Sequence, residues 1–199
     1  MYTVIGSPKT RAIRVIWMLE ELGVPYSLDP VPPRDAKLAA INPSGKVPIL
    51  KDGGDYVIDS VAILQYLADK HGKITNTAGT IARAHQDSWT HFAADDVEYG
   101  LWTAAKHKFV LPAELRCADV KPACIHDFDR AMSAFSQRLG DNTYVMGDAF
   151  TVPDIVLGHC AGWASSMGWT LPDGNAGTYF TRVRERPAAI RAFAIRDKA

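Results

Sequence analysis

The stretch Asn42-Pro43-Ser44-Gly45-Lys46-Val47-Pro48-Ile49-Leu50, and after it Asp59-Ser60-Val61-Ala62-Ile63-Leu64-Gln65-Tyr66-Leu67, indicates the fold of this chain most directly. The pattern predicts a turn, a proline at the start of a strand, a hairpin, and a helix that begins at an Asp-Ser pair. Because proline cannot donate to a β-ladder, we expect a sharp bend that leaves backbone groups free for a ligand. The Val47-Pro48 bond is a candidate cis peptide bond.

The Asp59-Ser60 pair stands directly before an apolar helix. Ser60 can cap that helix, and the N–H groups of the first turn would bind a carboxylate. Free backbone beside an anion-binding helix start suits a small acidic peptide. The alternative is a plain hairpin followed by a capped helix, and the spacing alone does not decide between the two.

The first part of the chain alternates between strand and helix patterns. Residues 2–5 and 26–29 are predicted strands, and apolar residues recur at helical spacing between them until Gly23 ends the helix. The sequence Asp52-Gly53-Gly54-Asp55 lies between two apolar runs and predicts a hairpin. A predicted helix over 60–71 follows. The order βαβ and then ββα predicts a small thioredoxin-like sheet.

The second part of the chain has a different pattern. Residues 72–80 are rich in Gly, Thr and Asn and have no periodicity, which indicates a linker over 73–80. Beyond them the pattern is almost purely helical. We therefore expect an α/β domain of thioredoxin-like topology over 1–72 and an all-helical bundle domain over 81–199.

The composition excludes several classes of function. Lys+Arg and Asp+Glu both number 22, so the formal net charge is zero, whereas a nucleic-acid-binding protein would carry a basic stripe. The longest apolar runs are far shorter than the roughly 20 residues of a membrane span. The first residues have no basic region and are predicted to form a strand rather than a signal peptide. We expect a cytoplasmic protein without a membrane or nucleic-acid partner.

The cysteines and histidines do not form a recognisable reactive or metal-binding pattern. Cys117, Cys124 and Cys160 include no CxxC pair, so neither a redox pair nor a zinc site is indicated. The six histidines include no HxxxH or HExxH pair. We expect no metal cofactor.

Four segments together resemble the glutathione S-transferase family. The Val47-Pro48 and Asp59-Ser60 stretches are similar to its glutathione site, and the segment 7–26 is similar to the first helix of many bacterial members. Residues 144–155 resemble the hallmark of its helical domain, and Arg186-Pro187-Ala188 also fits. The resemblance covers nearly the whole chain, and it depends on the order of the four segments rather than on any single one.

The resemblance implies roles for particular residues. The backbone of Val47 and Pro48 would pair with the cysteinyl part of glutathione, and Asp59-Ser60 would hold its γ-glutamyl end. Lys46 would contact the glycyl carboxylate. Arg11 could add positive charge near the sulfur. The absence of a cysteine from the first helix disfavours the glutaredoxin-like members.

In this family a hydroxyl in the loop after the first strand activates the thiol of glutathione. Here that loop offers Ser7 and Thr10, and we expect Thr10 to act before Ser7 because it lies at the predicted helix start. The alternative for either residue is helix capping. The spacing differs from that of the well-known serine classes, because a register taken from Gly23 puts Lys9 or Arg11 at the position of their catalytic residue.

The resemblance implies an enzyme that conjugates glutathione, its co-substrate, to a small electrophile held by the helical domain. It also implies a twofold homodimer. Glutathione-dependent isomerisation or dehalogenation would use the same thiolate. A protein of a different class, a non-catalytic member that uses the fold for binding or interaction, is the second alternative.

Overall fold

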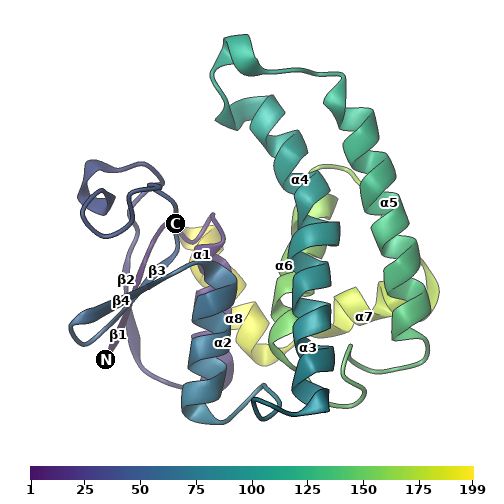
Figure 1. The fold of residues 1–199 in the computed structure, drawn as a ribbon, viewed down its shortest axis with the longest axis horizontal. Helices are drawn as coiled ribbons and strands as arrows, with labels where there is room; N and C mark the ends of the chain where they lie inside the picture. Colours follow the sequence, from purple (N-terminus) through teal and green to yellow (C-terminus); the bar gives the residue numbers. More distant parts are fainter. The chain divides into compact units, whose positions relative to one another are not determined.

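The computed structural model describes residues 1–199, which form two compact units. The first unit contains Met1–Ala78 together with Arg184–Ala199, and the second contains Gly79–Val183. Figure 1 shows a small sheet with covering helices in the first unit and helices alone in the second. Each unit is described separately below.

The first unit has a four-stranded mixed sheet with the order β2-β1-β3-β4. Its strands and its two long N-terminal helices are β1 (Tyr2–Ile5), α1 (Ala12–Leu22), β2 (Tyr26–Asp29), β3 (Ile49–Asp52), β4 (Asp55–Ile58) and α2 (Ser60–His71). β1 is parallel to β2 and antiparallel to β3, and β3 is antiparallel to β4. This is the thioredoxin-like topology that the βαβ and ββα order predicts.

Helix α1 forms the centre of this unit. It is apolar on almost every side, and its side chains from Ala12 to Leu19 are all buried. Gly23 ends the helix in the left-handed conformation, with φ of 69°, and its N–H bonds to the Leu19 carbonyl. Glycine adopts this conformation at little cost. The chain can therefore leave the helix at Gly23 and enter β2 at Tyr26.

The last helix, α8 (Pro187–Lys198), packs on α1 and belongs to the first unit. Trp17 of α1 meets Phe193 edge to face, with ring centroids 5.5 Å apart. Glu21 binds Arg186 at 2.6 Å, and Glu20 binds Arg191 at the same distance. The sequence division placed this segment with the helical domain, because a helical pattern alone does not show which core its apolar face covers.

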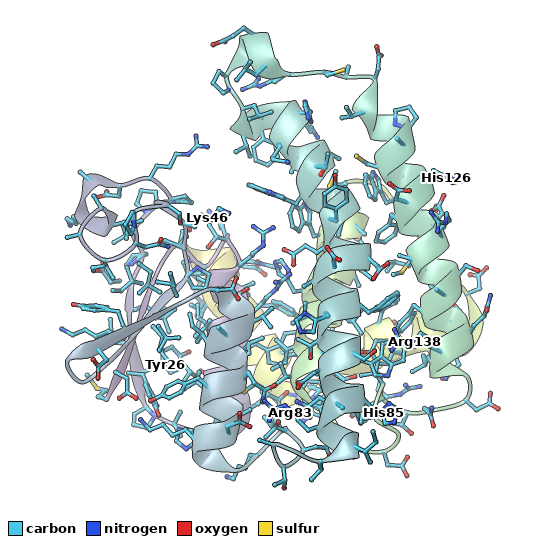
Figure 2. The ribbon with its side chains drawn as sticks, in the orientation of Figure 1. Tyr26, Lys46, Arg83, His85, His126 and Arg138 are labelled. Carbon is cyan, nitrogen blue, oxygen red and sulfur yellow. The ribbon has the colours of Figure 1, made fainter.

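The Glu20 carboxylate joins two parts of this contact. Burial acts to raise its pKa, but hydrogen bonds from Arg191 and Tyr26 outweigh burial and hold the pKa below its ordinary range. The Tyr26 hydroxyl donates to Glu20 Oε1 at 2.7 Å, and Tyr26 is labelled on β2 in Figure 2. Both C-terminal arginines thus connect α8 to the α1–β2 corner.

The second unit is helical, with helices α3 (Ile81–Phe92), α4 (Glu98–Ala105), α5 (Val120–Leu139), α6 (Val152–Ser166) and α7 (Gly174–Arg184). A π-helical turn, Ala93–Val97, joins α3 to α4, and the two form one continuous rod in Figure 1. Its core is aromatic: Phe135 stacks on Phe180 with ring centroids 4.9 Å apart. None of the helices is long and apolar enough to cross a lipid bilayer.

Candidate glutathione site

The register of the sheet brings three loops to one end of the first unit. Ile49 of β3 pairs with Ile5 at the end of β1 and with Ile58 at the end of β4. The residues just beyond this row are Gly6 and Ser7 after β1, Val47 and Pro48 before β3, and Asp59 and Ser60 after β4. The segment after β1, which lies 40 or more residues before the other two in the sequence, is therefore brought to the same end of the sheet as they are.

Gly6 allows two of these loops to approach closely. Its φ is +139°, and a Cβ added to it would lie 2.8 Å from Cβ of Val47. No real side chain tolerates that distance, so only glycine fits here. The Gly6 N–H donates to the Asp29 carbonyl and the Ser7 N–H to the Val31 carbonyl, which fixes Ser7 beside the Val47 loop.

The Val47-Pro48 bond is cis, as the sequence suggested. The β-ladder begins at Ile49, so the backbone N–H and C=O of Val47 lie outside it. Asn42, which is buried, holds the loop: its Nδ2 donates to the Lys46 carbonyl at 2.9 Å, and its Oδ1 accepts from the Ser44 hydroxyl at 2.8 Å. The sequence analysis assigned no role to Asn42, although an Asn before Pro-Ser-Gly is typical of a side chain that organises a turn.

The loop hydroxyls differ in what they already bind. The Thr10 hydroxyl donates to the Ser7 carbonyl at 2.7 Å and accepts from the Ala12 N–H at 3.2 Å. The Ser7 hydroxyl accepts from the Lys9 N–H at 3.3 Å, so its own proton is left for another acceptor. This arrangement favours Ser7 over Thr10 as a donor to a ligand, the reverse of the order expected from the sequence.

At the start of α2, Asp59 is the capping residue. Its Oδ1 accepts from the Val61 N–H at 2.9 Å and from the Ala62 N–H at 3.1 Å, and its φ is 74°. The expectation that Ser60 caps the helix is corrected here, because Ser60 is already the first helical residue and its side chain cannot fold back over the helix end. Two first-turn N–H groups are thereby occupied, and the N–H of Ser60 is left outside the cap.

Ser60 itself is only 4% exposed, and a buried arginine binds it. Nη1 of Arg14, on α1, donates to Ser60 Oγ at 3.3 Å. The sequence pattern did not predict that Arg14 contacts Ser60. The available signal was a single charged residue inside the apolar pattern of α1, but sequence alone does not show that it reaches α2.

The remaining predicted residues lie at the rim. Arg11 is partly exposed at the N-cap position of α1 and makes no side-chain capping bond. Lys46 is exposed on the loop before β3, where Figure 2 labels it. Asp59 is exposed, whereas Val47 and Pro48 are buried. Ser7, Val47, Asp59 and Ser60 thus form the centre of the candidate site, with Lys46 and Arg11 beside it.

The comparisons with known proteins agree with this geometry. Residues 1–76 match the family model for the glutathione S-transferase N-terminal domain. Glutathione S-transferase 3 of Schizosaccharomyces pombe is 36% identical over 104 residues, which cover 48% of this chain and 42% of that protein. The first 76 residues of this chain therefore resemble glutathione S-transferases in sequence as well as in fold.

Two further similarities were found. The probable elongation factor 1-gamma 2 of Arabidopsis thaliana is 30% identical over 122 residues, which cover 58% of this chain and 28% of that protein. A theta-class glutathione S-transferase from Xanthomonas axonopodis pv. citri, solved with glutathione bound, has the same fold, with a TM-score of 0.83, 24% identity and 96% of both chains covered. The chain spans less than half the length of the first curated relatives that it matches.

The aromatic residues of the helical unit have different environments. Phe92 and Trp169 are buried, whereas Tyr99 and Phe109 are more than half exposed. Phe92 and Tyr99 line a groove of about 220 Å³ whose other walls carry Asp95, Asp96, Asp127 and Arg130. The groove is therefore lined by both apolar and charged side chains. Nowhere in the chain do three or more His, Cys, Asp or Glu side chains form a group that could hold a metal ion.

Proposed function

We propose that this chain is a glutathione transferase that transfers the thiolate of glutathione to a small electrophile. One observation carries the proposal. The proposal is supported by the strand register, which brings three groups to one end of the sheet: the loop after β1 with its hydroxyls, the backbone of Val47 outside the β-ladder, and the first N–H of α2. These groups complement a thiol, a peptide backbone and a carboxylate, and glutathione carries all three.

The proposed placement follows from the charge of each group. The γ-glutamyl carboxylate would accept hydrogen bonds from the N–H and hydroxyl of Ser60, where the helix dipole also favours an anion. The carboxylate of Asp59 would face the γ-glutamyl ammonium. The backbone of Val47 and Pro48 would bind the cysteinyl residue, and Lys46 would lie near the glycyl carboxylate.

Ser7 is proposed as the donor to the sulfur, with Thr10 second and Arg11 as an additional positive charge. A cysteine thiol has a pKa of about 8.5, and a decrease of two units requires roughly 2.7 kcal/mol of preferential stabilisation of the thiolate. A hydroxyl hydrogen bond to the charged sulfur together with a helix N-terminus supplies that order of magnitude. The thiolate then forms a C–S bond to the electrophilic carbon, and a leaving group such as chloride departs with the electron pair.

Two measurements test this function. The purified chain should be retained on immobilised glutathione and eluted by free glutathione. It should then convert 1-chloro-2,4-dinitrobenzene to the glutathione conjugate. Retention without turnover would reject conjugation of this substrate class, and absence of retention would reject the site itself.

The choice between the two hydroxyls has its own test. Ser7→Ala should raise the pH at which turnover reaches half of its plateau, because the hydrogen bond to the thiolate is lost. Thr10→Val, which keeps the shape of the side chain, should leave that pH unchanged. The opposite pattern would assign the role to Thr10, and no change in either variant would leave backbone N–H groups or Arg11 as the source of stabilisation.

A second candidate function is non-catalytic binding. The similarity to elongation factor 1-gamma proteins favours it, because the name of those relatives refers to a translation factor rather than to a transferase. Glutathione-dependent isomerisation or dehalogenation would use the same thiolate as conjugation. We also propose a cytoplasmic homodimer, and a monomer mass in light scattering at micromolar concentration would contradict the dimer.

A further inference from the structure

Arg14 is buried inside the first unit, at the back of the proposed site. It is 1% exposed and stands among the largest fully buried side chains of the chain. A buried guanidinium is costly unless its donors are satisfied. One of its donors, Nη1, is directed at the hydroxyl of Ser60, 46 residues further along the chain.

The chemistry of the two groups fixes the direction of this hydrogen bond. A guanidinium carries only donors, so Ser60 Oγ must accept. The single hydroxyl proton of Ser60 is then directed away from Arg14. Because Asp59 already occupies the N–H groups of Val61 and Ala62, the hydroxyl and N–H of Ser60 are the donors that remain for a ligand at this helix start.

We propose that Arg14 is a positioning residue of the glutathione site, an inference that rests on the function proposed above. Arg14 does not touch the ligand. It holds the Ser60 hydroxyl in one orientation, with the proton facing the γ-glutamyl carboxylate, and it places a positive charge behind that hydroxyl. Both effects stabilise the bound γ-glutamyl carboxylate, and neither acts on a ligand that lacks this group.

The dependence on the γ-glutamyl carboxylate distinguishes a positioning role of Arg14 from a purely structural one. A merely structural arginine would affect all ligands of the site equally when replaced. The test therefore compares glutathione with its analogue in which a 4-aminobutanoyl group replaces γ-glutamyl. The analogue keeps the ammonium, the thiol and the glycyl carboxylate, and it loses only the carboxylate assigned to Ser60.

The binding experiment uses calorimetry on wild type, Arg14→Gln, Arg14→Lys, Ser60→Ala and the Arg14→Gln/Ser60→Ala double variant. Arg14→Gln should weaken glutathione binding by roughly 5- to 50-fold, the range expected for losing support of a charged hydrogen bond. It should change the affinity for the analogue by less than about twofold. Arg14→Lys keeps the charge and should recover part of the loss. In the Ser60→Ala background, Arg14→Gln should have little further effect.

Equal losses for the two ligands, or an undiminished effect of Arg14→Gln in the Ser60→Ala background, would overturn the inference. If the arginine variants do not fold, an NMR measurement on the wild-type protein still tests the role of Arg14. The Nε–H resonance of Arg14 in ¹⁵N NMR should shift on addition of glutathione and remain in place on addition of the analogue. Shifts of equal size with both would overturn it.

The failure of this inference and the failure of the proposed function give different results. If wild type binds neither ligand, the proposed glutathione site is wrong. If wild type binds glutathione but the arginine variants do not discriminate between the ligands, only the role of Arg14 is wrong.

Discussion

Two helices of this chain begin with an aspartate and a hydroxyl residue, and they use them in opposite ways. At the start of α6, Thr151 and Asp154 form a capping box. Asp154 is fully buried and accepts from the N–H groups of Val145 and Thr151 and from the hydroxyls of Thr151 and Tyr179. At the start of α2, Asp59 is exposed and accepts only two N–H groups.

The comparison shows how a helix start can serve either stability or binding. The donors around Asp154 are satisfied within the protein and closed off from water, so that end of α6 has nothing to offer a ligand. At α2 the cap leaves the first N–H outside, and Arg14 donates to the Ser60 hydroxyl, which leaves the proton of that hydroxyl for another acceptor. The same chemical groups become a structural centre in one unit and a candidate binding site in the other.

Removal of the Asp154 carboxylate should have the largest effect on stability. Asp154→Ala leaves several buried donors without an acceptor, each at about 1–3 kcal/mol, so the free energy of unfolding should decrease by roughly 3 kcal/mol or more. Urea unfolding followed by circular dichroism measures this. Asp141→Ala, at an exposed aspartate, is the control and should change stability little. A loss as small as that of the control would mean that Asp154 does not hold this network together.

Removal of the Ser60 hydroxyl should act on binding instead. Ser60→Ala should weaken glutathione binding by about 1–3 kcal/mol in calorimetry, because a hydrogen bond to a charged carboxylate is lost. The matched variant Thr151→Ala should leave glutathione affinity unchanged and should destabilise the protein by about 1–2 kcal/mol. An unchanged affinity of Ser60→Ala would remove the distinction between the two helix starts.

The buried Asp154 should make the stability of the protein depend on pH. Burial raises the pKa of Asp154 to about 6, although hydrogen bonds from Thr151, Tyr179 and Val145 act against it. An aspartate in an unfolded chain has a pKa of about 3.9. Between these values the native state binds more protons than the unfolded state, so this group should reduce stability as pH rises from about 4 to 6.

The size of this effect should be on the order of 1–2 kcal/mol. It is measured as the difference between the unfolding free energies of wild type and Asp154→Asn across that pH range. A difference that grows with pH would show that the hydrogen bonds to Asp154 outweigh its burial.

Much of this comparison could be predicted from the sequence, and the reasons differ by residue. Thr151 and Asp154 stand at capping-box spacing, so their roles follow from local chemistry. The strand order follows from the βαβ and ββα pattern, and it brings the residues before β3 and after β4 to the same end of the sheet. Local spacing does not encode a contact across 46 residues, which is why the role of Arg14 could not be predicted.

The order of Thr10 and Ser7 and the placement of α8 differ from the expectations because both depend on contacts that local spacing does not encode. The sequence placed Thr10 before Ser7 because Thr10 lies at the predicted helix start, but its hydroxyl donates to the Ser7 carbonyl, a bond that depends on how the loop turns. Helix α8 was assigned to the helical domain because its apolar residues are equally compatible with any core. Its actual partners, Trp17 and the two glutamates of α1, are more than 160 residues away.

The smallest predicted effect concerns Lys46, at the open side of the α2 site. Its side chain is exposed, so an ion pair with the glycyl carboxylate of glutathione is screened by water and salt and should contribute only about 0.2–1 kcal/mol. Lys46→Ala should therefore weaken binding by a few-fold at low salt, and the loss should nearly disappear at about 0.5 M salt, where the Debye length is well below its 8 Å at physiological ionic strength. Lys46→Arg should keep most of the affinity.

The loss in Ser60→Ala should persist at high salt, since its hydrogen bond lies in a buried position. Calorimetric titrations of all three variants at two salt concentrations test this difference. A Lys46→Ala loss that does not depend on salt would mean that the Lys46 side chain does not act through an ion pair with the ligand.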